Sequence, residues 1–99
     1  MVTPIEQRYI DQNAKSAELH VSARGIFPDG VTHDTRRQKP FPFYVTHAQG
    51  PHKWDVDGHQ IIDYLTGHGS MILGHAHPEI VAAVSQQVAK GTHPRHAEA

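Results

Sequence analysis

The sequence predicts an α+β fold made of an N-terminal helix, a three-stranded antiparallel meander and a second helix. Three observations support this prediction. Residues 3–6 carry a helix-start signal, Asp57-Gly58 is typical of a tight hairpin turn, and Pro78 opens a second segment with helical periodicity. At 99 residues the chain can form one small domain and is too short for a second.

The first helix is expected over about residues 4–23. Thr3 can cap it, Pro4 fits the first helical position and Glu6 can complete a capping box. Its apolar face is expected to hold Ile10, Ala14, Ala17 and Val21. Prolines and glycines among polar residues then predict a loop over residues 25–42.

Three short strands are expected within about residues 43–64, the last two joined at Asp57-Gly58. A glycine-rich loop over residues 65–77 should lead into a helix over about residues 78–90. A sheet this small with one helix on either side leaves apolar faces uncovered, so we expect the segment to dock onto a larger body.

Asp55 and Asp57 could be interpreted as paired carboxylates for acid and base chemistry. Residues two apart on a strand simply share a face, however, and both flank a turn. The structural interpretation is therefore favoured.

The composition excludes several classes of partner. Nine basic and ten acidic residues nearly cancel, so we expect neither nucleic acid nor an anionic membrane surface as a partner. The sequence has no apolar run long enough to cross a bilayer and no signal-peptide core at its start, which predicts a cytoplasmic location. The absence of cysteine excludes disulfides and thiolate zinc sites.

Ten histidines, including the pair His75 and His77, raise the alternative of a small His-rich metal-binding or protein-interaction module. A metal site needs three or four converging ligands, and the histidine spacing here matches no such pattern. We expect His75 and His77 instead to fix the loop before Pro78, with one side chain capping the helix.

Residues 54–78 read WDVDGHQIIDYLTGHGSMILGHAHP. The motifs WDVDG, IDY and GxGSMILGHxHP resemble the amino-terminal region of class III aminotransferases, pyridoxal-phosphate enzymes that include glutamate-1-semialdehyde 2,1-aminomutase, the closest resemblance. The resemblance extends over about residues 8–93 and ends before residues 94–99. It implies the N-terminal part of a fold-type I transferase, an N-terminal fragment only, whose large pyridoxal-phosphate domain is absent.

The resemblance also implies a carboxylate-binding arginine. Residues 27–31 resemble the I-P-G-G-V segment of the aminomutases, and counting onward places Arg36 at the arginine that receives the substrate carboxylate. Thr32 and His33 fall where that family has small polar residues, which makes them further substrate-binding candidates. From the residues alone, Arg36 and Arg37 can equally be a solvated basic pair.

A second group of candidates lies in the glycine-rich loop. It lacks the patterns of a nucleotide-phosphate cradle, but its glycines permit a close approach of backbone to a ligand. In the family the matching segment reaches the active-site region, with an aromatic residue at the position of His68. We therefore expect His68, Gly69 and Ser70 to contact substrate.

No catalytic or cofactor-binding residue is expected in this chain. Its lysines (Lys15, Lys39, Lys53 and Lys90) lie in contexts unlike that of the family's Schiff-base lysine. The resemblance implies that the full-length parent is a homodimer that uses pyridoxal phosphate on an amino-group-bearing carboxylate such as glutamate-1-semialdehyde. The isolated chain is predicted to be inactive and to need no cofactor.

Overall fold

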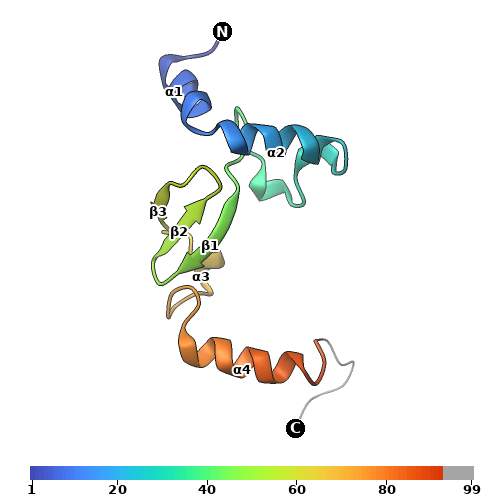
Figure 1. The fold of residues 1–99 in the computed structure, drawn as a ribbon, viewed down its shortest axis with the longest axis vertical. Helices are drawn as coiled ribbons and strands as arrows, with labels where there is room; N and C mark the ends of the chain where they lie inside the picture. Colours follow the sequence, from blue (N-terminus) through green and yellow to red (C-terminus); the bar gives the residue numbers. More distant parts are fainter. Residues whose placement is uncertain (93–99) are drawn as a thin grey trace.

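The structure is a computed structural model that describes residues 1–92. It is elongated, with extents of 57 × 29 × 20 Å, and has two helices at one end, a sheet in the middle and a helix at the other end (Figure 1). The three-stranded sheet is antiparallel with strand order β1-β2-β3. The predicted α+β fold class is confirmed.

The helix expected over residues 4–23 is two helices, α1 (Pro4–Gln12) and α2 (Ala14–Arg24), so its prediction as one helix was wrong. Asn13 breaks it, because its side-chain Nδ2 donates to the carbonyl of Tyr9 at 2.8 Å. That side chain competes for the acceptor of the helical backbone bond, and the Asn13 N–H turns to Ile10 instead. The predicted capping box between Thr3 and Glu6 is confirmed.

Asp57 holds α2 on the sheet. Its carboxylate accepts from the backbone N–H of Lys15 at 2.8 Å and of Ser16 at 3.1 Å, in the first turn of α2. Partial burial acts to raise the pKa of Asp57, but the hydrogen bonds from Lys15 and Ser16 outweigh it and lower the pKa. A carboxylate at a helix N-terminus also complements the helix dipole.

The buried residue of α2 is polar, Ser16, which the predicted apolar face did not include, whereas Ala17 of that face is half-buried. Ser16 is fully buried, and its hydroxyl accepts from the backbone N–H of Tyr44 at 3.2 Å. Val21, expected inside, is 71% exposed. The apolar periodicity of this segment therefore does not identify its contact with the sheet.

The loop over residues 25–42 contains two 3₁₀ turns, η1 (Pro28–Gly30) and η2 (Asp34–Arg36). Its far end is anchored on α1, because the Tyr9 hydroxyl donates to the Phe41 carbonyl at 2.9 Å and the two rings lie 5.2 Å apart. Among the described residues, Phe41 is the one large apolar side chain that is buried.

The meander consists of β1 (Val45–Gln49), β2 (His52–Asp55) and β3 (Gln60–Ile62). Asp55 stabilises the turn between β2 and β3, because its carboxylate accepts from the backbone N–H of His59 and lies 2.8 Å from the His59 imidazole. With Asp57 bound to α2, both carboxylates have structural partners. The structural interpretation of the pair agrees with this geometry.

After β3 the glycine-rich segment makes a tight turn, α3 (Thr66–Gly69), and pairs with the β1–β2 turn. Gly50 and His75 exchange both backbone hydrogen bonds, at 2.8 and 2.9 Å. The helix α4 (Pro78–Val88) follows. Its N-cap, His77, makes no side-chain capping bond, so the predicted histidine cap was wrong, whereas His75 does fix the loop through Asp63.

The apolar stripe of α4 is uncovered in the described part of the chain. Residues Ile80, Val81, Val84 and Val88 are each about half exposed, and α4 packs against no other described helix or strand. None of the helices in residues 1–92 combines the length and apolarity needed to span a membrane. The exposed stripe agrees with the expectation of a segment that docks onto a larger body.

Candidate substrate site

A cavity of about 570 Å³ lies between the loop that follows α2 and the start of the sheet. Thr32, Thr35 and Arg36 line it from the loop, and Tyr44 and Lys53 line it from the sheet. Its apolar wall consists of side chains that include Phe27, Val31, Pro42 and Phe43. A mostly apolar cavity with a few polar groups is the usual form of a small-molecule site.

Arg36 is the cation of this cavity that lacks an acidic partner. Its Nη1 donates to the hydroxyl of Thr32 at 2.8 Å, and no acidic side chain within residues 1–92 forms an ion pair with it. Arg37 differs, because its Nη2 is paired with the Asp29 carboxylate and it does not line the cavity. Of the two adjacent arginines, Arg36 is therefore available for an external carboxylate.

His33 has a local structural role. Its Nδ1 accepts from the backbone N–H of Thr35 at 3.2 Å and lies 2.9 Å from the Thr35 hydroxyl, which caps η2. It is not among the residues that line the cavity. The structure thus brings Thr32 and Arg36 together at the cavity and leaves His33 outside the residues that line it. The substrate role of His33 stays a prediction.

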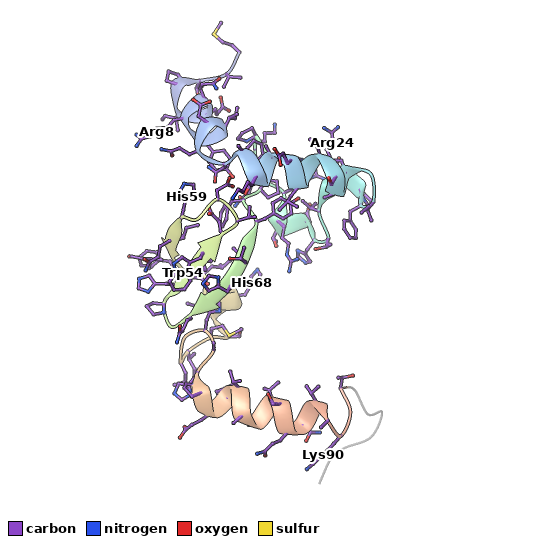
Figure 2. The ribbon with its side chains drawn as sticks, viewed as in Figure 1. Arg8, Arg24, Trp54, His59, His68 and Lys90 are labelled. Atoms are coloured by element: carbon purple, nitrogen blue, oxygen red, sulfur yellow. The ribbon has the colours of Figure 1, made fainter. Side chains whose placement is uncertain are left out.

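His68, Gly69 and Ser70 form a separate group at the α3 turn, outside the residues that line the cavity. Figure 2 shows His68 at the end of the sheet nearer to α4, whereas His59 marks the end next to α2. His68 has a φ of 59° and follows Gly67 at 61°, a left-handed pair in which the non-glycine residue costs about 1–2 kcal/mol. Ser70 uses its hydroxyl to donate to the Gly67 carbonyl at 2.8 Å. Their contact with substrate stays a prediction.

The side chains of the cavity that sequence reasoning missed include Tyr44 and Lys53. The Tyr44 hydroxyl is enclosed and has no hydrogen-bond partner among the described residues. The Nζ of Lys53 lies 5.7 Å from the centre of the Phe43 ring and 3.3 Å from Oδ1 of Asp63. The alternation along β2, which places Lys53 on the face opposite to Trp54, was the available signal.

Asp63 is a buried carboxylate whose two oxygens have several partners. Oδ2 lies 2.6 Å from Nε2 of His75, and Oδ1 accepts from the backbone N–H groups of Leu65 and Thr66 and from Lys53. The bond with His75 first, and then the bonds from Thr66, Leu65 and Lys53, hold the pKa of Asp63 well below its usual range. Asp63 is thus a stable negative charge between the sheet and the glycine-rich segment.

The histidines do not converge on a metal site within residues 1–92. Among these residues no group of three or more histidine, aspartate or glutamate side chains is placed to hold a metal ion. The His47 ring stacks on Trp54 at 4.6 Å, and His59 and His75 contact Asp55 and Asp63. This geometry gives the metal-binding alternative no support.

The comparisons with known proteins agree on one family. Residues 34–97 match the family model of class III aminotransferases. The fold of the chain matches the N-terminal part of solved fold-type I aminotransferases. The chain belongs to the class III aminotransferase family, which confirms the resemblance seen in its motifs.

Three relatives illustrate the match. The chain is 47% identical over 85 residues to the glutamate-1-semialdehyde 2,1-aminomutase of Methanopyrus kandleri, covering 86% of this chain and 20% of that protein. The glutamate-1-semialdehyde aminomutase structure from Pseudomonas aeruginosa PAO1 superposes with a TM-score of 0.83 at 26% identity, over 94% of this chain and 21% of that one. A transaminase structure with PLP bound superposes with a TM-score of 0.79 at 36% identity, over 87% and 20%. The chain spans about a fifth of the length of the relatives it matches.

The family is PLP-dependent, but the described residues of this chain do not fit PLP. Lys53, the lysine that lines the cavity, is held in an ion pair with Asp63, so its amine is not free to attack an aldehyde. Lys90 lies at the far end of α4, away from the cavity (Figure 2). The prediction that the chain alone needs no cofactor stays a prediction.

Proposed function

We propose that this chain is the segment of a PLP-dependent class III aminotransferase or aminomutase that holds the carboxylate of the substrate. The substrate is an amino-group-bearing carboxylate such as glutamate-1-semialdehyde, in keeping with the relative from Methanopyrus kandleri. The observation that best supports this proposal is the environment of Arg36. It lines the cavity, is oriented by Thr32 and lacks an acidic partner within the described residues.

The guanidinium of Arg36 suits this role chemically. It has five N–H donors in a planar fork, which can donate two parallel hydrogen bonds to a carboxylate. The bond to Thr32 uses one Nη1 proton and limits the rotation of the group. Arg36 is exposed, so its guanidinium is accessible to a ligand, and apolar side chains of the cavity lie beside it. This segment then binds and orients the substrate, while the rest of the enzyme holds the cofactor.

In the complete enzyme PLP would supply an electron sink and take up the amino group, on residues outside this segment. The isolated chain is therefore proposed to be inactive. We also propose that the complete protein is a cytoplasmic homodimer without a nucleic-acid or membrane partner, with the apolar stripe of α4 covered by the remainder of the enzyme. Sedimentation velocity and cell fractionation test the dimer and the location, and a monomer or a membrane-bound fraction would argue against them.

Carboxylate binding at Arg36 can be measured on the purified chain by NMR. We expect 4-aminobutyrate to shift the Nε–H signal of Arg36 with an affinity on the order of millimolar, and butylamine, which lacks the carboxylate, to leave it unchanged. Arg36→Gln should abolish the binding, and Arg37→Gln should keep it because Arg37 is already paired with Asp29. Equal shifts with both compounds, or unchanged binding in Arg36→Gln, would rule out the proposed role.

Inactivity of the isolated chain has a spectroscopic test. Mixing the purified chain with PLP should give no stoichiometric internal-aldimine band, and borohydride should not fix one equivalent of PLP at Lys53. The physical reason is the engagement of Lys53 by Asp63. A visible aldimine band that borohydride removes, with a stoichiometric mass increase, would contradict inactivity.

A further inference from the structure

We propose that Asp63 determines specificity by neutralising Lys53, so that the cavity presents one free cation and a second carboxylate on the substrate adds no affinity. This inference rests on the proposed function and deepens it by naming the substrate class. It concerns the charge balance of two side chains that the family motifs do not place together.

The cavity has two cationic side chains, Arg36 on the loop and Lys53 on β2. Two cations on one cavity suit a ligand with two anionic groups, unless one cation is already paired. Lys53 is paired, since its Nζ lies 3.3 Å from Oδ1 of Asp63, and both side chains are largely buried at 21% and 5% exposure. Arg36 has no such partner within residues 1–92.

The Asp63 side chain is held in place by several hydrogen bonds besides the one with Lys53. Its Oδ1 also accepts from the backbone N–H groups of Leu65 and Thr66, at 3.0 and 3.1 Å, and its Oδ2 lies 2.6 Å from His75. These bonds favour the charged carboxylate and fix it beside Lys53. The Lys53 side chain is confined on its other side by the ring of Phe43. Asp63 therefore holds Lys53 in a fixed position in the cavity wall, although Asp63 is not itself a lining residue.

The consequence is a cavity with one unbalanced positive charge, at Arg36. A monocarboxylate satisfies that charge. A dicarboxylate gains nothing from its second carboxylate, because Lys53 would first have to give up its partly buried ion pair with Asp63, which is unfavourable. Removing the charge of Asp63 without changing its shape should release Lys53 for the second carboxylate.

Asp63→Asn is the direct test, with butyrate and glutarate as probes in calorimetric or NMR titrations of the purified chain. In the unchanged chain we expect the two probes to bind with affinities within about twofold, since one cation is free. In Asp63→Asn we expect glutarate to gain roughly threefold to fivefold over butyrate, the size of a partly exposed charge pair. The double variant Asp63→Asn with Lys53→Met should lose this gain.

Asp55→Asn is the matched control, because Asp55 is a buried carboxylate on the same strand as Lys53 but forms its ion pair with His59. It should leave the ratio of the two affinities unchanged. The same gain in Asp55→Asn, no gain in Asp63→Asn, or a gain that survives Lys53→Met would each overturn the role of Asp63.

A single Lys53→Met variant keeps the test decisive if Asp63→Asn does not fold. It removes the lysine that neutralises Asp63 and leaves the carboxylate with His75 and two backbone N–H groups, so we expect butyrate binding to weaken by roughly twofold to threefold. Unchanged butyrate binding would overturn the inference. If the unchanged chain binds neither probe through Arg36, the proposed function fails; if it binds butyrate through Arg36 and the ratio does not respond to Asp63, this inference alone fails.

Discussion

Arg36→Ala should raise the KM for a carboxylate substrate by about tenfold to a hundredfold in a glutamate-1-semialdehyde 2,1-aminomutase whose matching segment is replaced by residues 1–92 of this chain. A hydrogen-bonded pair that includes charged groups contributes about 1.5–3 kcal/mol, and each 1.4 kcal/mol is tenfold in affinity. Binding of a simple amine should change little, because it lacks the group that Arg36 holds. Steady-state kinetics with 4-aminobutyrate and butylamine as amino donors measure the difference.

Arg37→Ala supplies the control for that experiment. It removes the same charge one residue away, but Arg37 is paired with Asp29 and does not line the cavity. Its KM for the carboxylate substrate should stay within about twofold of the unchanged chimera, because exposed ion pairs contribute little. An equal effect of Arg36→Ala on both donors, or an equal effect of the two variants, would exclude Arg36 as the carboxylate-binding residue.

Gly74→Ala should destabilise the glycine-rich segment by about 2–4 kcal/mol. Gly74 has a φ of 78°, and a Cβ there would lie 3.0 Å from the backbone atoms of Gly50. The segment would have to move away from the β1–β2 turn, which breaks the two backbone bonds between Gly50 and His75. Chemical denaturation followed by circular dichroism and hydrogen exchange of the His75 amide measure the loss.

Gly58→Ala separates steric overlap from backbone strain. Gly58 also has a positive φ, 91°, but a Cβ there would meet no atom within 4 Å. Its cost should therefore be limited to the strain of the left-handed backbone, about 1–2 kcal/mol. If Gly74→Ala is no more destabilising than Gly58→Ala, the close approach of Gly74 to Gly50 does not hold the two segments together.

The local signals in the sequence predicted most of the secondary structure. Thr3 and Glu6 form the expected capping box, Asp57-Gly58 forms the expected turn, and Pro78 opens the last helix. The break at Asn13 could not be predicted from periodicity, because it depends on a side-chain bond that replaces a helical one. The polar inward face at Ser16 also depends on tertiary contacts, with Tyr44 and Asp57.

The candidate site was predicted less completely, for a similar reason. Sequence and resemblance singled out Arg36, but they could not distinguish it from Arg37 by its environment. The distinction depends on Asp29, whose left-handed backbone at φ 54° accompanies its pairing with Arg37. Lys53 and Asp63 are ten residues apart and come together only because β2 and β3 are paired. Such contacts follow from the fold and not from a local pattern.

The most direct test of the central claim, that Arg36 holds the substrate carboxylate, is a crystal structure of the chimeric enzyme with a bound amino-carboxylate inhibitor. We expect the two carboxylate oxygens to lie at about 2.7–2.9 Å from two nitrogens of the Arg36 guanidinium, the distance typical of charge-assisted bonds. The Thr32 hydroxyl should still accept from Arg36, and Lys53 should remain paired with Asp63. An inhibitor carboxylate bound elsewhere, with Arg36 in solvent, would contradict the account.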